Sequence, residues 1–389
     1  MQNHESKFYD IEYFKVLNHL MKRPPINLEF SDFSLFAVVP ILLHFELLLR
    51  GLQHLGMQIS AVIGIEYSSK KEIAKRLSKD IPSLSVPRFD LISKHVERKL
   101  SQVLGTQNEK NYKKLIILEN GGYTVPILHK KFNEYIYLCK GAVEETKHGL
   151  WLDEQIEHLR IPVITIADTP LKQLESPIVG REIVQVLENE LNKVGFTVVG
   201  SKICVLGFGS IGAAIATAFR SMGALVACYD VDPIKTLAAR LSGFVTGVKR
   251  KLLRDADIVI GATGQCSIGR KDIQNLKDSA FLASASSKRG EIAVNEILSL
   301  TVERNKLSKQ VELFRLSDGR SMYIIGDGYP INFLLSDPSC GPPRFFDLIV
   351  SDLFVGIMEL MEKELKPGIH RISSCLEKKI TKLWLKFYE

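Results

Sequence analysis

The sequence predicts an α/β fold with parallel sheets, because strand-like apolar runs alternate with helix-like stretches in two series, one before about residue 180 and one after residue 202. The chain has 389 residues, more than one hydrophobic core usually organises, since a domain commonly holds about 150 residues. We therefore expect at least two domains, each built on its own sheet.

The composition is that of an ordinary globular protein. Hydrophobic residues make up 46% and charged residues 24% of the chain, which excludes disordered, collagen-like and disulfide-scaffold classes. The net charge of +7 comes from small, scattered basic groups, so no nucleic-acid-binding face is indicated. The most apolar runs, 36–49 and 348–361, contain charged residues and fall short of the roughly 18 uninterrupted apolar residues of a membrane span.

The cysteines and the N-terminal segment favour a cytoplasmic protein. The first 30 residues are polar and hold no apolar signal segment. No CxxC pair and no metal-ligand spacing of Cys, His and acidic residues is present, so we expect no bound metal. The six cysteines stand far apart, as reduced thiols would, at Cys139, Cys204, Cys228, Cys266, Cys340 and Cys375.

The first series of elements follows the polar segment 1–30, whose structure is left open. Apolar runs bounded by turn residues predict strands, and helical spacing of apolar residues predicts helices. In order, we expect a strand at 35–39, a helix reaching residue 55, a strand at 59–65, a helix at 70–78, and strands at 115–118 and 161–166.

The second series shows the cleaner alternation. The dipeptide Asp318-Gly319 favours a hairpin turn between strand-like segments within 311–325, and the last fifty residues have a helical pattern that ends in an amphipathic stretch at 375–387. The other elements, in order, are a helix at 178–194, a strand at 203–207, a helix at 211–222, a strand at 225–229, a helix at 233–241, a strand at 257–261, a helix at 271–276 and a strand at 280–284.

A glycine-rich turn, GFGSIG, lies directly between a predicted strand and a predicted helix. Gly207 allows the tight turn, Gly209 lets the backbone approach a pyrophosphate, and Gly212 lets helix and strand pack closely. Ser210 and Ile211 begin the helix, whose N-terminal N–H groups and dipole attract that anion. The pattern predicts a dinucleotide site.

Asp230 supports this assignment, because it ends the next strand at about the offset where a carboxylate binds both ribose hydroxyls of NAD. A carboxylate there repels the 2′-phosphate of NADP, so NAD is the expected cofactor. Thr263 and Gly264 follow the strand at 257–261 and should line the same crevice. The alternative is a structural α/β domain with an incidental aspartate.

Residues 36–372 resemble the S-adenosylhomocysteine hydrolase family, a group of homotetrameric NAD enzymes. The order and spacing of several separated segments carry the resemblance. These segments are GAVEETKHG (141–149), IPVITIADTPLK (161–172), VGREI (179–183), GFGSIG (207–212), Asp232-Pro233, ATG (262–264), FRLSDGR (314–320) and GDG (326–328) followed by Asn332.

The resemblance implies a Rossmann NAD-binding domain inserted in a second α/β, substrate-type domain that C-terminal helices close. It places the substrate in the cleft between the two domains and leaves a homo-oligomer as a possible assembly. In the family, NAD oxidises the 3′-hydroxyl of a nucleoside, the thiol is eliminated, water adds and the ketone is reduced again. The expected ranges are a lead-in at 1–30, the substrate-type domain at 31–180 with 338–389, and the Rossmann domain at 181–337.

The resemblance also assigns residue roles. Lys172 matches the lysine that handles the 3′-hydroxyl, and Glu145 matches the glutamate that binds the sugar hydroxyls. Asn332 and Thr146 match positions near the cofactor or substrate. The alternatives are an exposed lysine for Lys172 and a glutamate that favours a helix N-terminus for Glu145. His148, which the family lacks at its position, is a candidate general base or a structural hydrogen-bonding residue.

Several residues depart from the family pattern, and most of them belong to the hydrolase constellation. An aspartate-asparagine pair is replaced, three histidines are lost, and one acid has become an amide. The residues at these positions are Pro40, Asn120, Ser176, Pro177 and Ser287, with Asp337 or Gly341 at the third histidine, depending on alignment.

Two functions follow from an intact NAD motif beside an altered substrate pocket. The first is an NAD-dependent redox enzyme that oxidises a hydroxyl of a nucleoside-like or other small substrate, with the elimination step altered or lost. The second is a non-catalytic NAD-holding regulator or assembly partner. A stand-alone 2-hydroxy acid dehydrogenase is a third hypothesis, but its arginine and histidine-carboxylate pair are not evident in the sequence.

Overall fold

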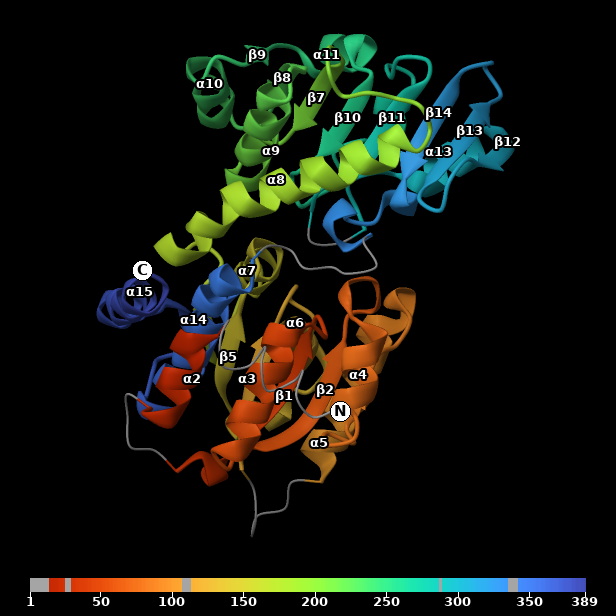
Figure 1. Cartoon of the computed structure of the whole chain (residues 1–389). Helices are drawn as coiled ribbons and strands as arrows, with labels where there is room; N and C mark the ends of the chain where they lie inside the picture. Colours follow the sequence, from red (N-terminus) through yellow and green to blue (C-terminus); the bar gives the residue numbers. More distant parts are fainter. Residues whose placement is uncertain (1–13, 25–28, 107–112, 287–288, 335–341) are drawn as a thin grey trace, which may run out of the picture. The chain divides into compact units, whose positions relative to one another are not determined.

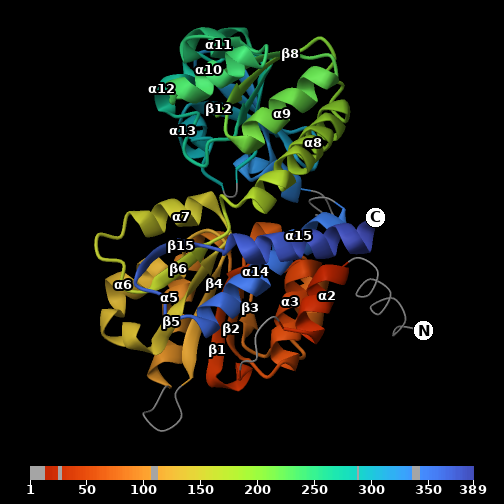
Figure 2. The same cartoon turned by 90° about the vertical axis from the view of Figure 1, so that its left-hand side faces the viewer.

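The computed structural model describes residues 14–24, 29–106, 113–286, 289–334 and 342–389. The chain forms two compact units, shown from two directions in Figures 1 and 2. Unit 1 consists of Met1–Gln173 with Pro342–Glu389, and unit 2 of Leu174–Gly341. Unit 2 is therefore an insertion in the chain of unit 1, and each unit has its own sheet.

Unit 1 contains a seven-stranded sheet with the order β15-β6-β5-β4-β1-β2-β3, in which all paired strands run parallel. The carboxyl ends of all these strands consequently lie at one edge of the sheet. The strands are β1 (Phe33–Val39), β2 (Gln58–Gly64), β3 (Leu84–Ser85), β4 (Lys114–Glu119), β5 (Cys139–Glu144), β6 (Pro162–Thr165) and β15 (Gly368–Arg371).

Helices cover both faces of this sheet, which explains why its central strands are apolar on both sides. In β1, Leu35 and Val39 belong to the core under one set of helices, whereas Phe36 and Val38 belong to the core on the other face. The helices are α2 (Lys15–Lys22), α3 (Leu43–His54), α4 (Lys71–Leu77), α5 (Ile92–Gly105), α6 (Thr124–Lys131), α7 (Lys147–Glu154), α14 (Pro343–Glu362) and α15 (Ser374–Tyr388).

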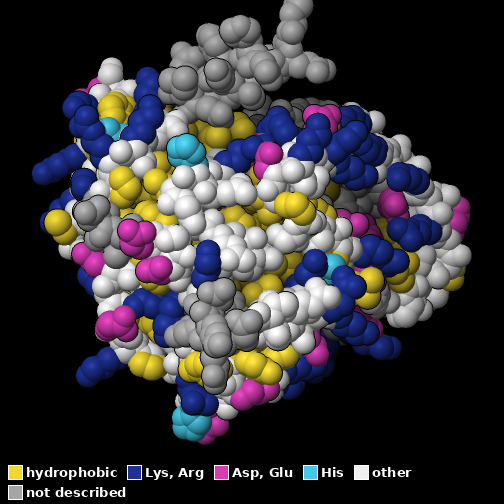
Figure 3. Space-filling model, turned by 90° about the horizontal axis from the view of Figure 1, so that it is seen from below, with side chains coloured by type: hydrophobic (Ala, Val, Ile, Leu, Met, Phe, Trp, Pro, Cys, Tyr) yellow, Lys and Arg dark blue, Asp and Glu magenta, His cyan; other side chains and the backbone are white. Residues whose placement is uncertain are grey.

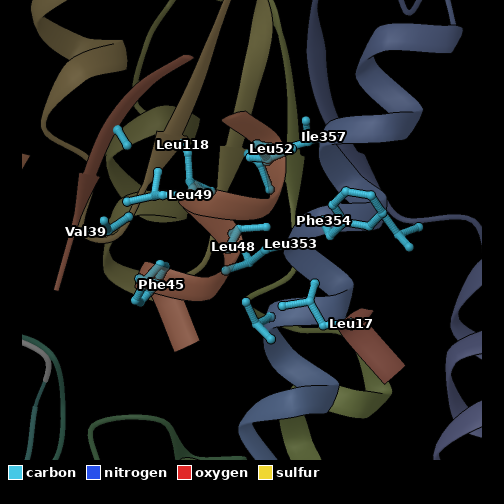
Figure 4. Packing of buried hydrophobic residues seen from close by; sticks show 14 of the residues in the cluster. Leu17, Val39, Phe45, Leu48, Leu49, Leu52, Leu118, Leu353, Phe354 and Ile357 are labelled. Carbon is cyan, nitrogen blue, oxygen red and sulfur yellow. The ribbon is translucent and has the colours of Figure 1, made fainter. Parts of the chain in front are cut away.

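Figure 4 shows the first of these cores, where α3 lies between the sheet and α14. Leu48 of α3 lies beside Leu353 of α14, whereas Leu49 of α3 lies beside Val39 and Leu118 of the sheet. The N-terminal helix α2 joins them, because both carboxylate oxygens of Asp347 in α14 accept N–H groups from its first turn. The C-terminal helices therefore close unit 1, as expected.

Unit 2 contains an eight-stranded sheet with the order β12-β13-β14-β11-β10-β7-β8-β9. The strands from β14 to β9 run parallel, and β12 and β13 add an antiparallel extension. The strands are β7 (Lys202–Leu206), β8 (Leu225–Tyr229), β9 (Val245–Thr246), β10 (Ile258–Gly261), β11 (Ala280–Ser284), β12 (Thr301–Lys306), β13 (Val311–Leu316) and β14 (Ser321–Ile325). The helices are α9 (Ser210–Ser221), α10 (Pro233–Leu241), α11 (Lys249–Asp255), α12 (Arg270–Ile273) and α13 (Val294–Ser299), and α8 (Pro170–Asn192) begins in unit 1 and continues in unit 2.

The structure confirms the α/β class with parallel sheets and corrects three local expectations. The last fifty residues are not all helical, because β15 lies among them at the sheet edge. Strand β5 was not predicted, since Lys140 and Gly141 interrupt its apolar run. Helix α8 begins at Pro170 rather than near residue 178, and it continues past Pro177, which removes one main-chain donor without ending the helix.

The surface carries no large single-sign region on the face in Figure 3, where basic, acidic and apolar side chains are interspersed. Among the described residues, no helix combines the length and the apolar character needed to cross a membrane. Those residues also contain no cluster of three or more His, Cys, Asp or Glu side chains suited to a metal ion.

Candidate functional site

The glycine-rich turn follows β7 and opens α9, as predicted. Gly207 has a φ of +98°, which a residue with a side chain rarely adopts, and its N–H donates to Tyr229 O at 2.7 Å. Gly209 is the N-cap of α9, and Ser210 and Ile211 are its first residues. The N–H groups of a first helical turn have no partner inside the helix, so this turn can accept an anion, as predicted for the diphosphate.

The lack of a side chain has a different reason at Gly212 and at Gly209. A Cβ at Gly212 would lie 2.0 Å from Gly207 O, so the fold itself requires this glycine. A Cβ at Gly209 would meet no atom within 4 Å, and its φ of −76° is open to any residue. The space in front of Gly209 therefore suits a ligand, and the residues present fit the diphosphate of NAD.

Asp230 follows β8 and lies beside this turn. Its Oδ2 accepts the N–H of Phe208 at 2.7 Å, and its Oδ1 accepts the N–H of Asp232 at 2.9 Å. Each carboxylate oxygen keeps a further lone pair for a ribose hydroxyl. The structure thus brings Asp230 and the glycine turn together, and the ribose contact stays a prediction.

The predicted residues Thr263 and Gly264 form the turn after β10, and Asn332 lies in a short 3-10 helix, η6 (Ile331–Phe333), after β14. Both segments follow carboxyl ends of parallel strands, where open α/β sheets bind ligands. Glu291 holds the first turn, because its Oε1 accepts the N–H groups of Thr263 and Gly264, each at 2.6 Å. No sequence pattern had indicated Glu291.

Unit 1 holds a second polar cluster, also at the carboxyl edge of its sheet. Asn120 follows β4, Glu145 follows β5, and Lys172 lies in the first turn of α8 after β6. Lys172 Nζ donates to Glu145 Oε1 at 2.8 Å, and Asn120 Nδ2 donates to Glu145 Oε2 at 2.9 Å. Burial alone would raise the pKa of Glu145, but the charge of Lys172 and these hydrogen bonds hold it below its usual range.

His44 lies near this pair, in the first turn of α3 after β1. Its ring stacks on Phe346 with 4.8 Å between centroids and 4° between planes. Burial lowers the pKa of His44 to about 4, although the charge of Glu145 acts in the opposite direction. His44 is therefore a neutral imidazole at physiological pH. The cluster thus consists of Lys172, Glu145, Asn120 and His44, which follow the four neighbouring strands β6, β5, β4 and β1.

Unit 1 contains three further buried carboxyl groups, those of Glu119, Glu144 and Asp153. Glu119 accepts the N–H groups of Thr124 and Val125 at the start of α6, and Glu144 accepts those of Gly121 and Gly122. Burial raises the pKa of both groups, and these hydrogen bonds act against the rise. Among the described residues, neither carboxyl oxygen of Asp153 has a hydrogen-bond partner, and burial with the charges of Glu119 and Glu144 raises its pKa to about 9. Asp153 is therefore protonated at neutral pH.

The two remaining predicted residues, Thr146 and His148, lie at the start of α7 in unit 1. Thr146 is the N-cap, because its Oγ1 accepts the N–H of Gly149 at 3.0 Å and donates to Glu144 Oε1 at 2.7 Å. The ring of His148 lies edge-on to Trp151, with 6.5 Å between centroids. The bonds that join Lys172, Glu145 and Asn120 do not include His148, and both predicted roles stay predictions.

Some predicted positions fall outside the described residues. These are Ser287, Asp337, Cys340 and Gly341. The upper bound of the predicted Rossmann domain, residue 337, falls there as well. Pro40, Ser176 and Pro177 are described, and Ser176 and Pro177 lie within α8, four and five residues beyond Lys172.

Comparison with known proteins identifies relatives of the chain. Residues 184–337 match the family model of the S-adenosyl-L-homocysteine hydrolase NAD-binding domain. The adenosylhomocysteinase of Pyrococcus abyssi is 27% identical over 84% of this chain and 76% of its own length. The S-inosyl-L-homocysteine hydrolase of Methanothermobacter thermautotrophicus is 25% identical over 69% of this chain and 67% of its own length.

Among solved structures, a dipicolinate synthase from Bacillus halodurans is 12% identical, with a TM-score of 0.43 over 86% of this chain and all of that one. The match of the NAD-binding domain agrees with the glycine turn, its open position at Gly209 and the carboxylate of Asp230. The chain is therefore similar to adenosylhomocysteinases, its residues 184–337 match the NAD-binding domain of that family, and NAD is its cofactor.

Proposed function

We propose that this protein is an NAD-dependent redox enzyme that oxidises a hydroxyl group of a nucleoside-like or other small polar substrate. The observation that carries the proposal is the buried pair of Lys172 and Glu145 at the carboxyl edge of the unit 1 sheet. Their side chains are only 18% and 9% exposed. A buried ion pair often adds little to stability, because both charges lose their hydration, so a functional reason for it is favoured.

Each member of the pair has a proposed role. The ionised Glu145 accepts hydrogen bonds from substrate hydroxyls and fixes their position. Lys172 first releases its own proton to water and then takes the proton of the hydroxyl that is oxidised. Bound NAD+ supplies the hydride acceptor, so the carbon loses a hydride, the oxygen loses a proton, and a carbonyl forms.

The proposed substrate differs from that of the hydrolases, because much of their constellation is replaced. Pro40, Asn120 and Ser176 stand where the family uses a histidine and two acids. Each buried hydrogen-bond partner that a substrate loses costs about 1 to 3 kcal/mol, so elimination and hydration are proposed to be altered or lost. The named activity of the S-inosyl relative supports variation of the nucleoside within the family.

The test is an absorbance measurement at 340 nm on purified protein loaded with NAD+. We expect at least one member of a panel of nucleosides, S-nucleosylhomocysteines, sugars and hydroxy acids to reduce the cofactor. Lys172→Met should then slow reduction by about a hundredfold or more, the usual size of a general-base effect. Lys94→Met is the control, because Lys94 is exposed on α5 of unit 1 and should leave the rate unchanged.

A non-catalytic NAD-holding regulator is the second candidate. One observation favours it: both oxygens of Glu145 are already bonded within the chain, to Lys172 and Asn120, so the cluster is satisfied without a substrate. NAD that stays bound but is not reduced by any member of the panel would support this candidate and count against the enzyme.

We also propose that the protein forms a homo-oligomer through α10. Its outer face is apolar, with Ile234 76% and Leu241 80% exposed and Leu237 beside them. Monomeric proteins rarely expose contiguous apolar patches of this kind, and the family resemblance implies homotetramers. In sedimentation velocity, we expect the wild type to be larger than a monomer and Leu241→Glu to be smaller than the wild type. Val199→Glu, at another exposed position of unit 2, should leave the size unchanged, and a monomeric wild type would contradict the proposal.

The proposed location is the cytoplasm. The described cysteines are all free thiols, at Cys139, Cys204, Cys228, Cys266 and Cys375. Free thiols are typical of a reducing compartment, and burial raises the pKa of Cys204 and of Cys228 to about 12. These two buried residues behave as small apolar side chains of β7 and β8.

A further inference from the structure

The loop that follows β11 lies between two other loops of unit 2. Strand β11 is flanked by β10 on one side and by β14 on the other, and all three run parallel. The turn at 262–264 therefore emerges on one side of the β11 loop. A second turn, the 3-10 helix η5 (Gly326–Gly328), emerges on the other side at the same edge of the sheet.

Arg289 of the β11 loop binds the turn after β14. Its Nε donates to the main-chain oxygen of Asp327 at 2.8 Å, and its Nη2 donates to Asp327 Oδ2 at 2.9 Å. The guanidinium also lies over the ring of Tyr329, 5.2 Å from its centroid. Asp327 has a φ of +51°, an unfavourable conformation for a residue with a side chain, so these contacts hold a strained turn.

Glu291 of the same loop binds the turn after β10. Besides the two N–H groups of Thr263 and Gly264, its carboxylate accepts the Thr263 hydroxyl at 2.9 Å. Glu291 is fully buried. A Cβ at Gly261 would lie 2.6 Å from Glu291 Oε2, so the last residue of β10 must be small for this carboxylate to fit.

Both turns are expected on the nicotinamide side of the predicted NAD site. Asp230 after β8 would mark the adenosine side, and the glycine turn after β7 would receive the diphosphate. A dinucleotide that continues across the sheet next passes the ends of β10, β11 and β14. The turn at 326–328 also precedes Asn332, for which the resemblance predicts a contact with the NAD amide or with the substrate.

We propose that Arg289 and Glu291 are positioning residues that hold the two turns on either side of the nicotinamide half of NAD. The loop after β11 carries both residues. The guanidinium of Arg289 binds the strained turn after β14, and the carboxylate of Glu291 binds the main-chain N–H groups of the turn after β10. Neither side chain needs to contact NAD. The effect on affinity arises because each turn is ordered before the cofactor binds. This proposal depends on NAD binding and is independent of the proposed reaction.

The test is calorimetric titration of the full-length protein, freed of nucleotide, with NAD+ and with ADP-ribose, which lacks the nicotinamide. For Arg289→Ala we expect the affinity for NAD+ to fall about five- to tenfold and the affinity for ADP-ribose to stay unchanged. Glu291→Gln places an amide N–H against two main-chain N–H groups, so it should weaken NAD+ binding by a similar factor and leave the affinity for ADP-ribose unchanged.

Arg320→Ala is the matched control. Arg320 also binds an aspartate, Asp318, and main-chain oxygens, those of Ile273 and Leu276, but it lies near the amino end of β14. It should bind both ligands as the wild type does, and Arg289→Lys should lose less affinity for NAD+ than Arg289→Ala. Unchanged affinities in Arg289→Ala and Glu291→Gln, or an equal loss in Arg320→Ala, would overturn the proposal. A wild type that binds neither ligand would instead contradict the cofactor assignment.

Discussion

Gly209→Val is expected to abolish measurable NAD binding while the protein remains folded. At this position NAD binding requires a glycine, but folding does not. A Cβ at residue 209 would meet no atom within 4 Å, and the backbone angles suit a β-branched residue. The valine would occupy the space of the diphosphate and block its approach to the N–H groups of α9. We expect the dissociation constant for NAD+ to rise about a hundredfold or more, which corresponds to about 3 kcal/mol.

Calorimetry with NAD+ measures this effect, and the thermal unfolding midpoint should remain within about 3 °C of the wild type. Gly105→Val is the control, because Gly105 at the end of α5 also has no atom near its Cβ position and lies in unit 1. A folded Gly209→Val variant with wild-type affinity would remove the glycine turn from the cofactor site.

Asp153→Asn is expected to stabilise unit 1 at pH 8. The pKa of Asp153 is raised from its ordinary 3.8 to about 9, so the folded state holds a proton that the unfolded state has released. The contribution of such a group to the free energy of unfolding is fully present below the ordinary aspartate pKa, and it is lost as the pH rises to about 9. Asparagine needs no proton, so it should raise the free energy of unfolding at pH 8 by about 2 to 4 kcal/mol and by much less at pH 4.5.

Urea unfolding followed by tryptophan fluorescence measures this prediction, since both tryptophans of the chain, Trp151 and Trp384, lie in unit 1. Glu157→Gln is the control, because Glu157 is exposed just after α7, is not among the groups that shift the pKa of Asp153, and should not change the pH dependence. Equal stability of Asp153→Asn and the wild type at pH 8 would show that the buried carboxyl is not protonated.

The cofactor half of the protein was more predictable than the rest because its signals are local. The strand, the three glycines and the helix of the dinucleotide site occupy one short segment, and each glycine has a geometric reason. Strand β15 gave no such signal, since its Gly-Ile-His-Arg sequence contains one large apolar residue and lies at a sheet edge. Its structure depends on pairing with β6, which no local pattern reports.

The contacts within the polar clusters could not be predicted from local sequence patterns either. Lys172 and Glu145 were found through matched motifs, but their bond, and the donation from Asn120, depend on three strands meeting at one sheet edge. Glu291 was missed because a buried glutamate resembles a surface glutamate in a sequence. Its role follows only from the N–H groups of a turn that lies 27 and 28 positions away along the chain.

The two ends of the unit 2 sheet affect how copies of the protein can associate. Strand β12 carries charged side chains, including Glu303, Arg304 and Lys306, and is exposed along most of its length, whereas β9 at the other end has two residues. A charged edge strand and a very short edge strand both disfavour pairing between the sheets of two molecules. Growth into fibrils by strand addition is therefore disfavoured, and the apolar side of α10 is the surface that we propose for a closed, symmetric assembly.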